Sequence, residues 1–280
     1  MTGLVDYPSS SDDDDNDERH EAVPPAEKQR VSDLPPLPAT FLDQYSSTVR
    51  TSVRDDASLH SGRQRVTPHV EGRWPTHVYL DWHPDAAESR LFSDVVAAAR
   101  QRLNLDVHSL LENELGVSLP LHVSLSRPLS LPTDQKEAYV ARLGEAIRTS
   151  QVQFFEVQPA EVLWHANESR TRNFLVARVR CASGRSLERL LTACNAVATE
   201  FFQPRLYSDG DEAAGARDEF HMSVAWSLGS ASLHGARQES ATLESQPIVP
   251  PALMAHVAAL SIQFSEVKVR VGQAVQTIPL

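Results

Sequence analysis

Apolar and polar residues alternate in several stretches of the chain, which predicts β-strands that each bury one face. These stretches are 76–82, 121–126, 152–157, 161–166, 173–180, 220–226, 258–271 and 275–280. The long alternation favours antiparallel sheets with one side facing solvent or a cleft. Residues 152–157 and 161–166 are expected to pair with each other.

Apolar positions at helical spacing predict helices between these strands. The helices are expected at 91–103, 133–149 and 186–202, with a shorter one at 107–115. Helices follow strands in both halves of the chain. We therefore predict an α+β fold that is bilobal and pseudo-symmetric, with two mainly antiparallel sheets flanked by helices around a central cleft.

The first 66 residues differ in composition from the rest. Residues 12–21 carry seven acids and one arginine, which contribute −6 to the net charge of −11. Few large apolar residues are available there to form a core. We expect 1–66 to be a disordered acidic and proline-rich region with a linker, and 67–280 to be the folded domain. Residues 230–252 are expected to be a polar connector within it.

Composition excludes several classes of protein. The two cysteines, Cys181 and Cys194, lack the spacing of zinc ligands, and two cysteines cannot form a disulfide framework. There is no run of about 18 apolar residues, so neither a membrane span nor a membrane partner is expected. The net charge argues neither for nor against a nucleic-acid partner, because the acidic run supplies more than half of it.

One short motif occurs twice within the predicted strands. Residues 121–126 read LHVSLS and residues 220–226 read FHMSVAW. Side chains two residues apart on a strand point to the same face. His122 and Ser124 should therefore share one face, and His221 and Ser223 should share another.

Two imidazoles and two hydroxyls around one cleft could act on a phosphodiester by acid–base catalysis. Imidazole titrates near neutral pH, so one histidine can accept a proton while the other donates one. Serine hydroxyls can donate hydrogen bonds to the phosphate oxygens. Metal ligation by His122 and His221 is a weaker alternative, because carboxylate partners at fitting spacing are missing. A serine nucleophile is weaker still, since Gly-x-Ser-x-Gly is absent.

The other histidines show no comparable pattern and are expected to be structural or exposed. They are His20, His60, His69, His77, His83, His108, His165, His234 and His256. Four arginines, Arg63, Arg65, Arg170 and Arg172, could steer a phosphate backbone.

The paired motifs resemble those of the 2H phosphodiesterase superfamily, and the chain is most similar to the U6 snRNA phosphodiesterase family within it. The resemblance covers about 34–280. It is carried by the two motifs and by LPPLP (34–38), GRQR (62–65), THVY (76–79), TRNF (171–174), VKVRVG (267–272) and IPL (278–280).

This resemblance implies a metal-independent 3′-to-5′ exoribonuclease without cofactors, located in the nucleus, that trims the uridine-rich 3′ end of single-stranded RNA. His122 and His221 would be the acid–base pair, with Ser124 and Ser223 binding phosphate. Tyr207 resembles a tyrosine that stacks on the terminal base, although residues 209–219 look like an insertion after it. We expect a monomer. Two alternatives stay open: a 2H enzyme that acts on small cyclic nucleotides or ligates RNA, and a non-catalytic RNA-binding splicing adaptor.

Overall fold

The computed structural model describes residues 70–103, 106–113, 116–167, 171–207, 219–228 and 248–280. The predicted region 1–66 and most of the predicted connector 230–252 lie outside these residues. Within them, the predicted α+β class with antiparallel strands is confirmed. None of the described helices is both long and apolar enough to cross a membrane.

The described elements are ten strands and four helices. The strands are β1 (Arg73–Trp82), β2 (His108–Ser109), β3 (Leu121–Ser124), β4 (Leu129–Pro132), β5 (Phe155–Ala166), β6 (Arg172–Cys181), β7 (His221–Leu228), β8 (Ile262–Phe264), β9 (Glu266–Val271) and β10 (Ala274–Pro279). The helices are α2 (Ala86–Leu103), α3 (Lys136–Thr149), α4 (Ser186–Glu200) and α6 (Pro251–Ala258).

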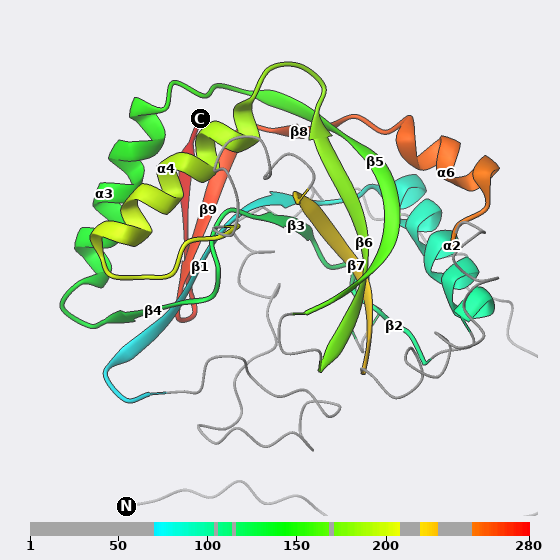
Figure 1. Ribbon diagram of the computed structural model, residues 1–280, viewed down its shortest axis with the longest axis horizontal. Coiled ribbons are helices and arrows are strands. Elements are labelled where there is room, and N and C mark those ends of the chain that lie inside the picture. The colour runs from blue at the N-terminus through cyan, green and yellow to red at the C-terminus, as the bar shows by residue number, and fades with distance from the viewer. Residues whose placement is uncertain (1–69, 104–105, 114–115, 168–170, 208–218, 229–247) are drawn as a thin grey trace, which may run out of the picture. The chain divides into compact units, whose positions relative to one another are not determined.

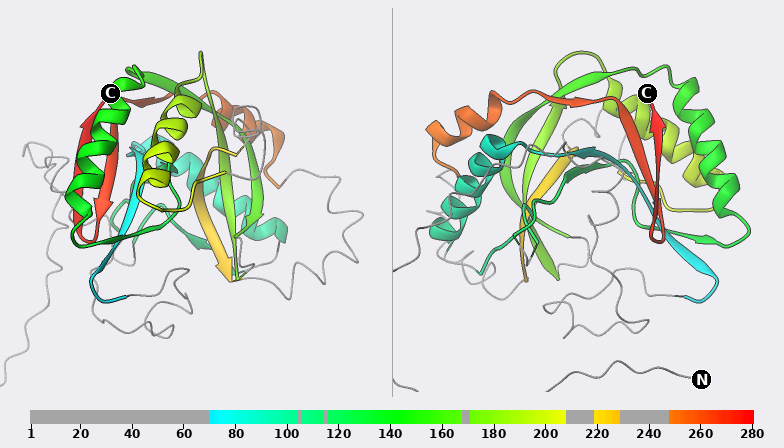
Figure 2. Two further views of the ribbon diagram at one scale, coloured as in Figure 1. Left: turned by 60° about the vertical axis from the view of Figure 1, so that its left-hand side comes forward. Right: turned by 180° about the vertical axis from the view of Figure 1, so that it is seen from behind.

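The strands form one antiparallel sheet in the order β10-β9-β1-β3-β7-β6-β5-β8, with β4 beside β1 and β2 beside β7. The sheet has two wings, one formed by β10, β9, β1 and β3 and the other by β7, β6, β5 and β8. The wings join where β3 pairs with β7, through Val123 and Met222. The two predicted sheets are thus the wings of a continuous sheet. Helices α3 and α4 lie together on the β9 and β1 side, and α2 and α6 lie together on the β5 side (Figure 1). The views in Figure 2 agree with this placement.

Two elements differ from the prediction because tertiary pairing outweighs local pattern. Residues 107–115 were expected to be helical, but β2 runs antiparallel to β7, and the Leu110 N–H donates to the Val224 carbonyl at 3.0 Å. The predicted pair 152–157 and 161–166 is a single strand, β5, with a bulge between Pro159 and Glu161. Proline has no N–H to donate to a ladder, and the bulge beside it allows the strand to continue.

The predicted strand 258–271 is also different. Helix α6 extends to Ala258, and the alternating residues after it form two strands, β8 and β9. β8 pairs with β5 in one wing, whereas β9 pairs with β1 and β10 in the other. Alternation alone does not reveal that a strand changes partners, because both parts keep one apolar face.

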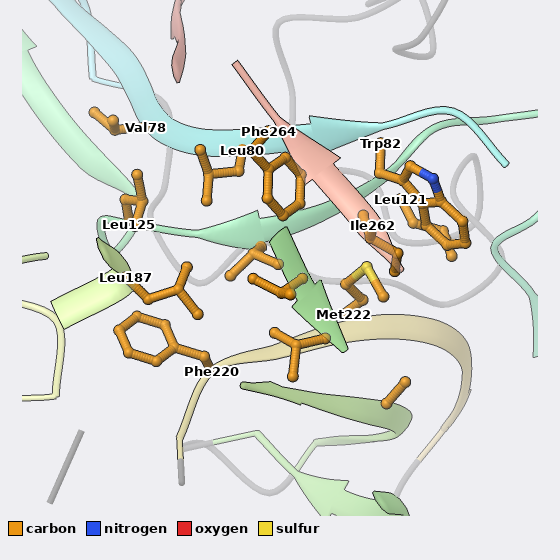
Figure 3. Packing of buried hydrophobic residues seen from close by; sticks show 14 of the residues in the cluster. Val78, Leu80, Trp82, Leu121, Leu125, Leu187, Phe220, Met222, Ile262 and Phe264 are labelled. Atoms are coloured by element: carbon orange, nitrogen blue, oxygen red, sulfur yellow. The ribbon is translucent and has the colours of Figure 1, made fainter. Parts of the chain in front are cut away.

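The core lies on one side of the central strands. Every second residue of β1, at 78, 80 and 82, is buried, as are Leu121 and Val123 of β3 and Met222 and Val224 of β7. Figure 3 shows the labelled side chains of β1, β3 and β7 gathered with Ile262 and Phe264 of β8. Residues at the intervening positions must point to the opposite face of the sheet.

Candidate active site

The two His-x-Ser motifs lie on neighbouring antiparallel strands at the junction of the wings. Val123 pairs with Met222, and both side chains are fully buried. One residue to either side along this register, His122 lies opposite Ser223, and Ser124 lies opposite His221. The four polar side chains therefore form a two-by-two array on the face away from the core.

In this array the two histidines occupy a diagonal. Diagonal neighbours on antiparallel strands are roughly 7–8 Å apart, and directly opposed residues roughly 5 Å apart. Each histidine is thus beside the serine of the other motif. A phosphate group that lies over the array would have an imidazole on each side and a hydroxyl next to each imidazole.

Strand β1 adds a third imidazole to the same face. His77 Nε2 lies 3.1 Å from Ser124 Oγ, and the His77 ring meets the His122 ring edge-on with centroids 5.4 Å apart. Tyr79 stacks on His77 at 5.2 Å and meets His122 at 5.6 Å. Across the next ladder, Arg270 of β9 is paired with His77. His77 was expected to be structural or exposed, yet it contacts a residue of the first motif.

Strands β6 and β5 add further polar residues beside His221, on the opposite side of the array from β1. Arg178 of β6 is paired with His221, and its guanidinium forms a 3.3 Å ion pair with Glu161 of β5. The exposed ring of His165, also on β5, lies 6.1 Å from the ring of His221. Two arginines therefore flank the histidines, Arg270 in one wing and Arg178 in the other.

The surroundings lower the pKa values of both motif histidines. Burial by the surrounding protein is the largest cause for His122, although part of its ring remains exposed. His221 and Arg270 lower the pKa of His122 further, and Asp81 raises it. Burial also dominates for His221, where the Glu219 carbonyl raises the pKa and His165 and Arg178 lower it. Because His221 lowers the pKa of His122, the two side chains lie within electrostatic reach of each other.

Main-chain contacts orient His221. Its Nδ1 lies 2.6 Å from the carbonyl oxygen of Glu219, which can only accept, so Nδ1 carries the proton. The neutral ring then presents an unprotonated Nε2. The hydroxyl of Tyr207 donates to the same carbonyl at 3.0 Å, and the Tyr207 ring packs edge-on against Phe220 at 5.8 Å. Tyr207 thus lies next to the second motif, and its role in base stacking stays a prediction.

The sequence identified the motif residues but missed their neighbours His77, Tyr79, His165, Arg178 and Arg270. A signal for the first two was available, because 77 and 79 are the polar-face positions of an alternating strand. No sequence pattern could place β1 beside β3. Of the arginines proposed to steer a backbone, Arg63, Arg65 and Arg170 lie outside the described residues. Arg172 Cζ lies 5.7 Å from the centroid of the Phe174 ring.

Within the described residues, no group of three or more histidine, cysteine, aspartate or glutamate side chains is placed to hold a metal ion.

Several proteins with sequences similar to this chain are named U6 snRNA phosphodiesterase 1. It is 39% identical to U6 snRNA phosphodiesterase 1 of Neurospora crassa over 231 residues, which cover 74% of this chain and 62% of the relative. The Mus musculus protein of the same name is 29% identical, with 71% and 66% covered. The match thus spans slightly less than two thirds of these relatives.

The fold has counterparts among solved structures. Usb1 of Kluyveromyces marxianus matches 74% of this chain and 98% of its own, with a TM-score of 0.56 and 19% identity. Its structure with uridine monophosphate matches with a TM-score of 0.57 and 20% identity. At such identity the likeness concerns the fold. Residues 35–279 match the family HVSL, described as an uncharacterised conserved protein, and the chain therefore belongs to the HVSL family.

Proposed function

We propose that this protein is a metal-independent 3′-to-5′ exoribonuclease that shortens uridine-rich 3′ ends of RNA, with U6 snRNA as the substrate. The observation that supports this most is the pairing of Val123 with Met222, which brings the two His-x-Ser motifs together on one face. The names of the relatives support the coarser statement that it is an RNA phosphodiesterase acting in U6 snRNA processing.

The proposed reaction begins at the 2′-hydroxyl of the penultimate nucleotide. His122 takes the proton of this hydroxyl, and the oxygen attacks the phosphorus that links the last nucleotide. The bond from phosphorus to the 5′-oxygen breaks, and His221 gives its proton to that oxygen. The last nucleoside leaves, and the shortened RNA carries a 2′,3′-cyclic phosphate. The two histidines could also act in the opposite roles.

The serines would stabilise the negative charge that develops on the non-bridging phosphate oxygens. Ser124 and Ser223 lie beside the two imidazoles, where their hydroxyls could donate to the non-bridging oxygens. If water then replaces the leaving oxygen, the same acid–base pair opens the ring to a 3′-phosphate. Product analysis distinguishes an RNA that ends in a 2′,3′-cyclic phosphate from one that ends in a 3′-phosphate.

His221 is suited to either role through its Nε2 atom. Because the Glu219 carbonyl accepts the Nδ1 proton, Nε2 is the only nitrogen that can exchange a proton with the substrate. A neutral His221 is a base at Nε2, and a protonated His221 is an acid at the same atom. The side chain therefore keeps one orientation through the reaction cycle.

The proposal is tested with a uridine-tailed oligoribonucleotide in EDTA. The wild type should shorten it from the 3′ end, whereas His122→Ala and His221→Ala should each be slower by at least about 100-fold, since acid–base groups contribute that much. His256→Ala, which removes an exposed imidazole on α6, is the control and should match the wild type. Shortening that requires an added metal, or an active His122→Ala variant, would refute the mechanism.

The same assay addresses the other interpretations. Oligoadenosine and small cyclic nucleotides serve as competing substrates, and a preference for the latter would favour a small-molecule phosphodiesterase. Binding of the oligouridine without any cleavage would favour an RNA-binding adaptor. A nuclear location and a monomeric state remain part of the proposal, and they can be checked by imaging a tagged chain and by light scattering.

A further inference from the structure

We infer that Tyr207 is a positioning residue for His221, acting through the main-chain carbonyl of Glu219, and that Asn195 on α4 holds Tyr207 in place for this task. The effect on turnover rests on the proposed function. The effect on the protonation site of His221 does not, because it can be measured without a substrate.

The carbonyl oxygen of Glu219 joins the two side chains. It accepts a hydrogen bond from Tyr207 Oη at 3.0 Å and one from His221 Nδ1 at 2.6 Å. Burial and Glu219 raise the pKa of the Tyr207 hydroxyl, so it remains a donor at physiological pH. A carbonyl held by a second donor cannot swing away from the imidazole without breaking that bond. The hydroxyl of Tyr207 thus fixes the group that selects the His221 tautomer.

Tyr207 is itself held from α4. Asn195 Nδ2 donates to the Leu206 carbonyl and Asn195 Oδ1 accepts from the Leu206 N–H, both at 2.9 Å. This two-point contact fixes the peptide just before Tyr207. Tyr207 has a φ of 54°, in the left-handed region that residues other than glycine rarely adopt. Such a conformation persists where surrounding contacts impose it, and it is frequent at functional sites.

The contact also bears on residues 209–219, which were expected to be an insertion after Tyr207. Residues 208–218 separate Tyr207 from Glu219 along the chain, yet the Tyr207 hydroxyl reaches the Glu219 carbonyl. The two ends of the stretch are therefore joined at the second motif. Extra length between Tyr207 and His221 need not separate them, because the hydrogen bond sets their spacing.

The experiment compares Tyr207→Phe with the wild type. Phenylalanine keeps the ring that would stack on a base and removes only the hydroxyl. Tyr139→Phe is the matched control, because Tyr139 is fully buried and no described residue hydrogen-bonds its hydroxyl. Imidazole ¹⁵N NMR of the labelled, full-length protein reports which nitrogen of His221 is protonated. Initial rates on the uridine-tailed RNA give kcat and KM.

We expect the wild type to show neutral His221 protonated at Nδ1. In Tyr207→Phe and in Asn195→Ala, a measurable fraction should move to the Nε2-protonated form. The kcat of both variants should fall about two- to tenfold, the effect of losing one hydrogen bond, with KM unchanged. Tyr139→Phe should leave all three quantities as they are.

Three results would overturn the inference. The first is a Tyr207→Phe variant with the wild-type His221 spectrum. The second is a fall in kcat without a change of tautomer, and the third is a rise in KM alone, which would mean that the hydroxyl contacts the substrate. If the wild type cleaves no RNA, the proposed function fails, and the NMR comparison still decides this inference.

Discussion

His77 Nε2 lies 3.1 Å from Ser124 Oγ, so a histidine outside both motifs contacts a hydroxyl of the first one. Burial, His122 and Arg270 lower the pKa of His77 to about 3, and its ring is therefore neutral at physiological pH. A neutral imidazole can donate from Nε2 to the serine oxygen. With Nε2 as the donor, Ser124 would keep its own proton for the phosphate oxygen of the proposed reaction, and His77 would position Ser124.

This geometry predicts that His77 and Ser124 act as one unit. Ser124→Ala should lower kcat/KM by about 100-fold, as expected for a lost donor to a developing charge. His77→Phe should lower it by about tenfold, since the serine remains but loses its orientation. The double variant should be no slower than Ser124→Ala alone, because the histidine acts through the serine.

The measurement is a double-mutant cycle on the uridine-tailed RNA at one pH. Independent roles would make the two effects multiply, and that result would contradict the coupling. Circular dichroism of each variant controls for loss of the fold.

The low pKa of His77 also predicts how stability depends on pH. Imidazole has a pKa of 6.5 when unfolded and about 3 here, so the unfolded chain binds more protons between these values. Stability from this group is therefore complete above pH 6.5 and is lost as pH falls toward 3. His77→Phe cannot titrate and should show a shallower decline in the free energy of unfolding from pH 7 to pH 5. Urea unfolding at each pH gives this slope, and equal slopes for the two proteins would argue against a depressed pKa.

The pH dependence of cleavage follows from the motif histidines. The proposed reaction needs one protonated and one neutral imidazole, and the surroundings lower the pKa values of both His122 and His221 from 6.5. The kcat/KM profile, which reports the free enzyme, should peak below pH 6.5 and decline as pH rises. Arg270 lowers the pKa of His122, so Arg270→Gln should raise this pKa. The limb of the profile that the titration of His122 controls should therefore move to higher pH.

The profile is measured on the same RNA between pH 4.5 and pH 9 at constant ionic strength. Arg148→Gln, which removes an exposed charge on α3, serves as the control and should leave the profile in place. A wild-type optimum above pH 7, or an unshifted profile in Arg270→Gln, would contradict the argument.

The sequence predicted the fold class because strand alternation and helical spacing are local signals. It could not predict where strands change partners. β8 pairs with β5, whereas β9 pairs with β1 and β10. The bulge after Pro159 keeps β5 continuous past a residue that commonly ends strands. These features depend on pairings between residues far apart in the chain.

The motif residues could be predicted because His-x-Ser within an apolar run is visible in the sequence. The sequence placed His77 on the polar face of a strand, but it could not show that His77 and Arg178 join the site, because they do so through the ladders β1–β3 and β6–β7. The contact of Tyr207 with the Glu219 carbonyl was also hidden, since a main-chain acceptor has no residue signature. Local patterns therefore found the groups proposed to react, and only the pairing of strands revealed the groups that orient them.

Two glycines give a paired test of the wing that carries His77. Gly272 joins β9 to β10 with a φ of 63°, and a Cβ there would lie 2.8 Å from Cε3 of Trp74. The indole of Trp74 cannot yield easily, because its Nε1 donates to Thr133 Oγ1 and Lys136 lies over its ring. Gly272→Ala should therefore lower the free energy of unfolding by about 1–3 kcal/mol.

Gly144 lies within α3 and is the matched control. A Cβ there would meet nothing within 4 Å. Alanine is the better helix former, so Gly144→Ala should raise the free energy of unfolding by about 0.5–1 kcal/mol. Urea unfolding of both variants at pH 7 measures the two effects. Opposite signs are expected because one alanine meets a clash in the left-handed region and the other only gains helix propensity. If Gly272→Ala were as stable as the wild type, Trp74 would be able to move away from the β9–β10 turn, and its contacts with Thr133 and Lys136 would not hold it in place.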